Sequence, residues 1–233
     1  MRLNPYVAVI LGATFGATSG VFIKLLQLPP TTMTFFRVFI PTVAVLLYIL
    51  FVKKTKLIRG NWKLMLGASA LNAIRMFLYF VAYLYTTLGN AVIMSQTWPI
   101  FAAIFGMFFL SEKVTKRTIF LIALAFLGVI IMSLNKEISF ANKEFFGMLV
   151  MMISGMIYAI TAIIFKKELA NYSKTETIFY QNVVGAVVFL PFIFINKPLP
   201  TVMQGMSGTI YGFLVGVIAF TLFFYGMKKL PMS

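Results

Sequence analysis

Hydrophobic stretches long enough to cross a lipid bilayer recur along the whole length of this 233-residue chain. A membrane-spanning helix needs roughly 20 apolar residues, because each residue adds only about 1.5 Å to its length. The composition agrees with this pattern, since 61% of the residues are hydrophobic, 11% are charged and the mean hydropathy is +0.97. The sequence therefore predicts an all-α polytopic membrane protein and not a soluble domain.

Eight spanning helices are expected, separated by short connections. Their predicted ranges are Tyr6–Lys24, Thr31–Val52, Trp62–Thr86, Ala91–Leu110, Arg117–Leu134, Phe146–Phe165, Thr175–Ile195 and Ser207–Met227. Cytoplasmic connections of membrane proteins carry an excess of lysine and arginine. With the N-terminus inside, fourteen of the 20 cationic residues lie on the cytoplasmic side and four on the outer side. We therefore expect a cytoplasmic N-terminus and a multi-pass protein of the bacterial cytoplasmic (inner) membrane. The net charge of +15 is then explained by the membrane topology, and we expect no nucleic-acid partner.

Several residue types that catalysis and metal binding use are missing. The chain has no cysteine, histidine or aspartate. Four of its five glutamates fall outside the predicted spans, and the fifth, Glu176, is only the second residue of the span Thr175–Ile195. This excludes disulfides, histidine-metal sites, Ser-His-Asp triads and intramembrane carboxylates from the visible chain. We expect neither an enzyme nor a bound metal or cofactor.

Arg75 lies near the middle of the third predicted helix. An arginine at the centre of a bilayer costs roughly 3 kcal/mol on insertion scales. Asn72, Tyr79, Tyr83 and Thr86 are spaced from it by threes and fours, so they share one side of the helix. A polar stripe at this depth must face protein or water. The pattern predicts a solute pathway with Arg75 on its wall. The alternative is that Arg75 only ties helices together through backbone carbonyls, or snorkels to an interface.

The fourth predicted helix carries a polar patch that ends at Pro99. Proline cannot donate its backbone hydrogen bond and clashes with the preceding turn, so a bend is expected there. The bend could be purely structural, or it could serve as a gate or as part of a binding site. In the sixth predicted helix, Ser154, Tyr158 and Thr161 share one side. The predicted substrate-binding residues are Asn72, Arg75, Tyr79, Tyr83, Gln96, Trp98, Tyr158 and Thr161.

Glycines recur every four residues in the first and last predicted helices. They are Gly12, Gly16, Gly20, Gly208, Gly212 and Gly216. Small residues at this spacing let another helix approach closely, so we interpret them as packing positions and not as binding positions. Arg37, about two turns into the second helix, is close enough to its end to snorkel. Arg75 is therefore preferred over Arg37 as a substrate contact.

The chain resembles itself when it is shifted by about 142 residues. Phe22-Ile23-Lys24 then meets Ile164-Phe165-Lys166, and the order of spans and connections agrees. One unit holds five spans, an odd number, so the second copy enters the membrane upside down. Such inverted repeats are typical of secondary transporters. We predict a first unit over residues 1–141 and an incomplete second unit over 142–233, with eight visible spans of an expected ten.

The chain resembles the EamA-type branch of the drug/metabolite transporter superfamily over essentially its whole length. The residues that carry the resemblance are Phe36-Arg37, Tyr83, Leu88-Gly89-Asn90-Ala91, Pro99, Phe108-Phe109-Leu110-Ser111-Glu112-Lys113 and Gly128. The resemblance implies two inverted five-helix units around a central cavity. Members of this family move amino acids, nucleotide-related metabolites and drugs.

The leading hypothesis is a permease that moves a small metabolite by alternating access: an amino acid, another anionic or zwitterionic solute, or a drug. Its expected partners are that solute and the lipid bilayer, and a homodimer is compatible with the sequence. The second hypothesis is a non-transporting assembly or lipid-handling protein, or an inactive truncated carrier. The sequence leaves open the solute, the direction of transport, the coupling ion and the oligomeric state.

Overall fold

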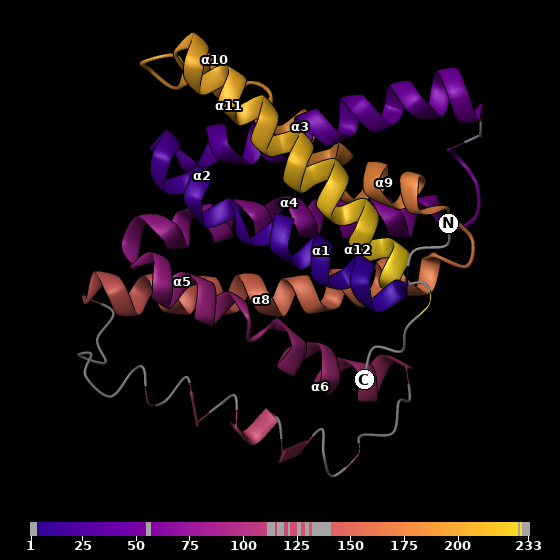
Figure 1. Cartoon of the computed structure of the whole chain (residues 1–233), viewed down its shortest axis with the longest axis horizontal. Coiled ribbons are helices and arrows are strands. Elements are labelled where there is room, and N and C mark those ends of the chain that lie inside the picture. Colours follow the sequence, from indigo (N-terminus) through magenta and orange to yellow (C-terminus); the bar gives the residue numbers. More distant parts are fainter. Residues whose placement is uncertain are drawn as a thin grey trace. The chain divides into compact units, whose positions relative to one another are not determined.

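A computed structural model gives the fold (Figure 1). It describes residues 4–54, 57–110, 115, 119–120, 122–124, 127–128, 131, 141–227 and 229. The helices are α1 (Pro5–Ala17), α2 (Ser19–Leu26), α3 (Pro30–Tyr48), α4 (Trp62–Tyr85), α5 (Leu88–Ser95), α6 (Trp98–Leu110), α8 (Lys143–Glu168), α9 (Lys174–Phe189), α10 (Phe192–Ile195), α11 (Val202–Phe213) and α12 (Phe220–Met227). Two short π-helical segments, η1 (Ile49–Lys53) and η2 (Leu214–Ala219), continue α3 and join α11 to α12.

Seven helical segments in the described part of the chain are long and apolar enough to cross a membrane. They are Pro5–Leu26, Pro30–Lys53, Trp62–Tyr85, Leu88–Phe109, Lys143–Glu168, Lys174–Ile195 and Val202–Gly226. The described residues contain no strand. The predicted all-helical, polytopic class is therefore confirmed. The predicted span Arg117–Leu134 lies largely outside the described residues. The inverted repeat, the ten-helix count and the cytoplasmic N-terminus stay predictions.

The ends of these helices are set by local polar residues. The Asn4 side chain accepts a hydrogen bond from the Tyr6 amide at the start of α1, where Pro5 is the first helical residue. Both α9 and α11 begin with a capping box, in which a hydroxyl and a side chain three residues later bond each other's backbone amides. Ser173 and Glu176 form the first box.

By its internal contacts the chain divides into two compact units. The first unit combines Met1–Ile74 with Ile164–Pro231, and the second is built on Arg75–Ile163. The boundary between the units passes through α4 and α8. This spatial division is distinct from the division predicted from the sequence, at residues 141 and 142, which stays a prediction.

In the first unit, α3 packs against α9 and α11, and α12 packs against α1 and α9. Figure 1 shows α12 in yellow beside α1 in indigo. The buried core of this unit comes from both parts of the sequence. It consists of Val45, Ile49, Met65, Ala68, Phe165, Leu169, Tyr172, Ile178, Phe179, Tyr180 and Phe224. Residues before and after the second unit are thus needed together to bury this cluster.

The glycines of the last span lie where its backbone meets α3. A Cβ added at Gly208 would lie 2.7 Å from the Phe36 ring, and one added at Gly216 would lie 2.7 Å from Pro41. A Cβ added at Gly212 would collide with the backbone carbonyl of Phe36. Real Cβ atoms do not approach this closely, so only glycine allows this separation of the two helices.

The glycines of the first span behave differently from one another. A Cβ at Gly12 would lie 2.9 Å from the Ala219 carbonyl oxygen, which is again a close helix approach. Gly20 is buried. At Gly16 no described atom lies within 4 Å of an added Cβ. Gly12 therefore lies where another helical segment approaches closely, whereas Gly16 does not.

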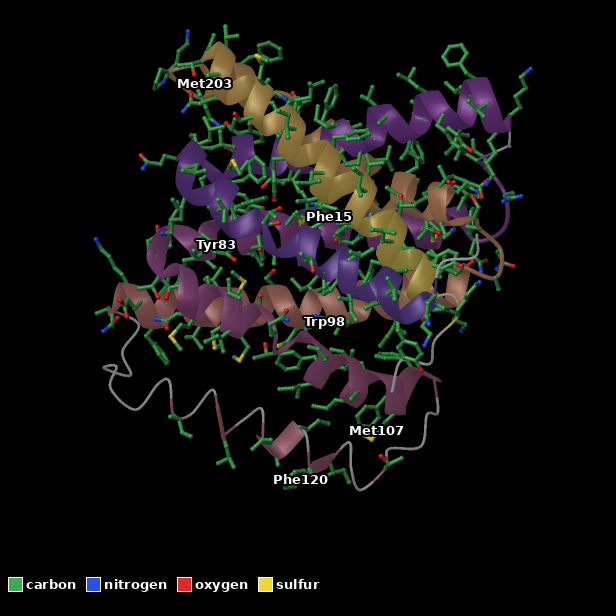
Figure 2. All side chains as sticks on the ribbon, viewed as in Figure 1. Phe15, Tyr83, Trp98, Met107, Phe120 and Met203 are labelled. Carbon is green, nitrogen blue, oxygen red and sulfur yellow. The ribbon has the colours of Figure 1, made fainter. Side chains whose placement is uncertain are left out.

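Large apolar side chains remain on the outside of the helices. Met203, labelled on α11 in Figure 2, is 79% exposed, and Phe108 on α6 is 77% exposed. In a water-soluble protein so many exposed apolar side chains would be costly. In a chain that spans a membrane, these faces contact lipid.

Candidate functional site

The middle of α4 carries the polar group that is most expensive to place in a membrane. Arg75 is the fourteenth residue of α4, so it lies about 20 Å along the helix from its first residue. Its side chain is buried, and the guanidinium carbon lies 4.5 Å from the centroid of the Tyr158 ring on α8. One guanidinium nitrogen also lies 2.6 Å from the sulfur of Met76. Arg75 is thus held against protein groups of the second unit.

An aromatic pair extends this contact to the start of α6. The rings of Tyr158 and Trp98 lie 4.9 Å apart at an interplanar angle of 66°, an edge-to-face contact. Trp98 is labelled in Figure 2, where α6 begins. Gly155, one turn before Tyr158, faces the start of α6, where an added Cβ would lie in ordinary contact at 3.6 Å from the Trp98 amide nitrogen. Arg75, Tyr158 and Trp98 therefore form one connected group, which we call the Arg75 cluster.

A hydrogen bond fixes α8 to α4 at the depth of this cluster. The Ser154 hydroxyl donates to the backbone carbonyl of Arg75 at 3.0 Å, and both residues are buried. Ser154 was placed with Tyr158 on one helix face but was not among the predicted site residues. Its spacing of four from Tyr158 is the sequence signal that connects them. Ser154 positions the backbone that carries Arg75.

Two tyrosines continue the polar stripe along α4 beyond Arg75. The Tyr79 and Tyr83 hydroxyl oxygens lie 3.2 Å apart, and their rings meet edge to face at 5.0 Å. Tyr83 is buried and Tyr79 is half-buried. Of the predicted stripe, Tyr79 and Tyr83 thus contact each other directly in the second unit.

The fourth span is broken at the polar patch before Pro99. The helix α5 ends at Ser95, and α6 begins at Trp98, with Pro99 as its second residue. The hydroxyls of Ser95 and Thr97 each donate to a backbone carbonyl three residues earlier, both at 2.7 Å. Such bonds compete with the regular helical pattern, and proline is well tolerated in a first helical turn. The sequence predicted a bend in one helix, whereas the structure has a break between two.

None of the contacts that the structure describes for three further predicted substrate residues is a side-chain contact with Arg75. The Asn72 amide donates to the Gln181 carbonyl at 2.7 Å within the first unit. The Thr161 hydroxyl donates to the carbonyl of Tyr158 in its own helix at 3.0 Å. Gln96, in the break, is exposed. Helical spacing placed Asn72 beside Arg75 along α4, but spacing alone does not identify which neighbouring helix each side chain meets.

Arg37 corrects another expectation. The side chain is only 3% exposed, so the snorkelling interpretation is wrong. Its guanidinium carbon lies 4.8 Å from the centroid of the Phe220 ring, and a Cβ added at Gly216 would lie 3.1 Å from one of its nitrogens. Because Gly216 has no side chain, the last span leaves room for the guanidinium beside the ring.

A second group of polar contacts lies at one end of the first unit, which we call the Glu176 cluster. Glu176 is fully buried and accepts two hydrogen bonds from Arg59, at 2.9 and 3.0 Å. It also accepts bonds from the amide and the hydroxyl of Ser173, both at 2.7 Å, and lies 3.7 Å from the Lys53 ammonium. The Tyr172 hydroxyl donates to the Arg59 carbonyl. These contacts join the connection before α4 to the start of α9.

The electrostatics of this cluster affect Tyr172, which lies between two spans. Burial raises the pKa of the Tyr172 hydroxyl above its ordinary value of 10.0, and the nearby charge of Glu168 raises it further. The Arg59 charge opposes these effects. In the part of the chain that the structure describes, no three His, Cys, Asp or Glu side chains gather as a metal ion would require.

Known proteins resemble this chain over nearly all of its length. The EamA-like transporter family matches residues 3–134 and 145–233. An uncharacterized transporter of Archaeoglobus fulgidus is 23% identical over 238 residues, which cover 98% of this chain and 82% of the relative. A pseudopaline exporter of Pseudomonas aeruginosa is 23% identical over 206 residues, which cover 88% and 71%.

A solved crystal structure supports the fold independently of these sequence matches. It superposes with a TM-score of 0.71 at 17% identity, over 98% of this chain and 80% of the other. At that identity the likeness concerns the fold alone.

Proposed function

The chain belongs to the EamA-like transporter family, and from this premise we propose that it moves a small anionic or zwitterionic metabolite across the cytoplasmic membrane by alternating access. An amino acid is the simplest solute of this kind, and a drug that carries a carboxylate is another. One relative is named as an exporter, so outward movement is the direction that we propose.

The observation that carries the proposal is the burial of Arg75 at mid-span against Tyr158. A guanidinium stacks on an aromatic ring through its face, while its N–H groups point outward in its own plane. In this proposal the side chain would rest on Tyr158 and bind a carboxylate or phosphate in addition to its contacts within the protein. Arginine binds such groups well because its planar fork matches their two oxygens.

The broken fourth span supports an anionic solute in the same cluster. The helix α6 has 13 residues and begins at Trp98, which contacts Tyr158, the same ring that Arg75 contacts. The N-terminal end of a helix carries a partial positive charge and exposes backbone amides. Transporters of several folds place the ends of such broken helices at their solute sites. Trp98 and Tyr158 would supply aromatic walls, and Tyr79 and Tyr83 would supply further hydroxyls.

Alternating access in this proposal uses the repeat that the sequence predicts. Units over residues 1–141 and 142–233, inserted with opposite orientation, would rock about a site near the bilayer midplane. The excess of lysine and arginine on one side supports a cytoplasmic N-terminus.

Transport into proteoliposomes tests this proposal. The full chain is reconstituted, and counterflow of labelled amino acids and other small carboxylates is measured. We expect at least one solute to move, and Arg75→Ala to reduce its transport at least tenfold. Arg37→Ala is the matched control, because Arg37 is also a buried arginine on an aromatic ring within a span. Unchanged transport by Arg75→Ala, for every solute that moves, would remove Arg75 from the site.

A further inference from the structure

Two lysines converge on one tyrosine at the end of the first unit. The ammonium nitrogen of Lys174, at the start of α9, lies 4.3 Å from the centroid of the Tyr225 ring on α12. The ammonium nitrogen of Lys229 lies 4.7 Å from the same centroid and donates to the Tyr225 hydroxyl at 3.0 Å. Because α12 packs against α9, these three side chains are brought together by the fold.

The position of this group along the spans corresponds to headgroup depth. Lys174 is the first residue of the span Lys174–Ile195, and Tyr225 is the penultimate residue of the span Val202–Gly226. Lys229 follows three residues beyond that span and is exposed. Tyrosine is enriched at this level of membrane proteins, since its ring is apolar and its hydroxyl is polar.

The partial charges at the helix ends favour a cation at only one of the two lysine positions. Lys229 follows the C-terminal end of α12, where a cation is favourable. Lys174 lies in the first turn of α9, where the partial positive charge of the helix opposes a cation. Lys53 also lies near Lys174, because it donates to Ser173, but its ammonium is paired with Glu176 at 3.7 Å.

The helix beside this group offers an apolar surface. The end of α12 meets the start of α1, where a Cβ added at Gly226 would lie 3.2 Å from the Pro5 carbonyl oxygen. The helix α1 exposes Tyr6 at 65% and Ile10 at 64%. A ligand with a phosphate at the lysines and an acyl chain along α1 would therefore contact both kinds of surface. A soluble phosphate would contact only the lysines.

We propose that Lys174, Tyr225 and Lys229 bind the phosphate of an anionic phospholipid headgroup, with the acyl chain lying on the exposed face of α1. The phosphate would place a negative charge beside the two ammonium groups that face the same ring. It also supplies the negative charge that the first turn of α9 favours. This proposal is independent of the identity of the transported solute.

Native mass spectrometry of the purified full chain tests the site. The protein is delipidated and titrated with phosphatidylglycerol and with phosphatidylcholine of the same acyl chains. We expect phosphatidylglycerol to bind more tightly, and Lys174→Gln with Lys229→Gln to weaken it about 30-fold, since each lysine near an anionic lipid contributes about fivefold. The control is Lys63→Gln with Lys167→Gln, which removes the same charge from two exposed lysines of this unit.

Each outcome decides the proposal. Equal weakening by the control pair would overturn it, because the effect would then be diffuse charge and not a site. Equal affinity for the two lipids would overturn it as well. Displacement of the lipid by glycerol phosphate at matched concentration would assign a soluble phosphate in place of a lipid. Thermal unfolding in neutral detergent checks that the double variant folds. If it does not fold, Lys229→Gln alone should weaken binding about fivefold, and unchanged binding would refute the site.

Discussion

Replacing Glu176 by glutamine removes one charge and leaves the shape of the Glu176 cluster. Glutamine also serves in the third position of a capping box, as Gln204 does at the start of α11. The helix start of α9 is therefore preserved in Glu176→Gln. What is lost is the charge-assisted pairing with Arg59 and the nearby Lys53.

The expected cost follows from the burial of the two partners. Breaking a fully buried ion pair by removing one charge costs about 3–5 kcal/mol. The Arg59 side chain is 45% exposed, so water screens its charge and offers it other partners. A hydrogen bond to a charged group contributes about 1.5–3 kcal/mol, and glutamine keeps one of the two acceptors. We therefore expect the free energy of unfolding to fall by about 2 kcal/mol.

Reversible unfolding in mixed micelles, with increasing denaturing detergent, measures this change. Gln204→Ala is the comparison, since it removes the third residue of a capping box that has no ion pair, together with a hydrogen bond to the Leu26 carbonyl, and should cost about 1–2 kcal/mol. Combining Glu176→Gln with Arg59→Gln should cost clearly less than the sum of the single changes. If Glu176→Gln lowers the free energy of unfolding by less than about 0.5 kcal/mol, the effect of an exposed pair, the reasoning is refuted. It is also refuted if the effects of the two single substitutions simply add in the double variant.

Three further outcomes are expected. Gly212→Ala should destabilise the chain by about 1–3 kcal/mol through overpacking against α3, whereas Gly16→Ala should be neutral or slightly stabilising, as unfolding curves of the pair would show. Ser154→Ala should cost about 1 kcal/mol of unfolding free energy by removing the bond to the Arg75 carbonyl, and no loss would contradict that bond. Because the folded-state pKa of Tyr172 is raised, the free energy of unfolding should fall as the pH rises above 10. A free energy that does not change with pH in this range would contradict the raised pKa, and so would a fall that is the same in Tyr172→Phe.

The spans and the unusual position of Arg75 could be predicted because both follow from the cost of the bilayer. An apolar run of sufficient length has few alternatives to a spanning helix, and an arginine in its middle must face protein or water. The contact partner could not be predicted in the same way. Helical spacing gives the side of α4 on which Arg75 lies, but only the fold shows that Tyr158 and Ser154 on α8 meet it.

Other contacts depend on residues far apart in the sequence. Arg59 and Glu176 are separated by 117 residues, and neither helical periodicity nor charge spacing connects them. The snorkelling prediction for Arg37 was wrong because it used only the distance to the helix end. The space that Gly216 leaves and the ring of Phe220 belong to the last span, and they make burial of that guanidinium acceptable.

Solute-dependent stabilisation of the purified chain in detergent tests the central claim most directly. A ligand that binds only the folded state adds about 2.7 kcal/mol at a concentration 100 times its Kd. For a small carboxylate that shifts the unfolding temperature, we predict that Arg75→Gln raises the half-maximal concentration at least tenfold and that Arg37→Gln leaves it nearly unchanged. The same concentration dependence in Arg75→Gln and the unsubstituted chain would contradict an anion site at the middle of α4.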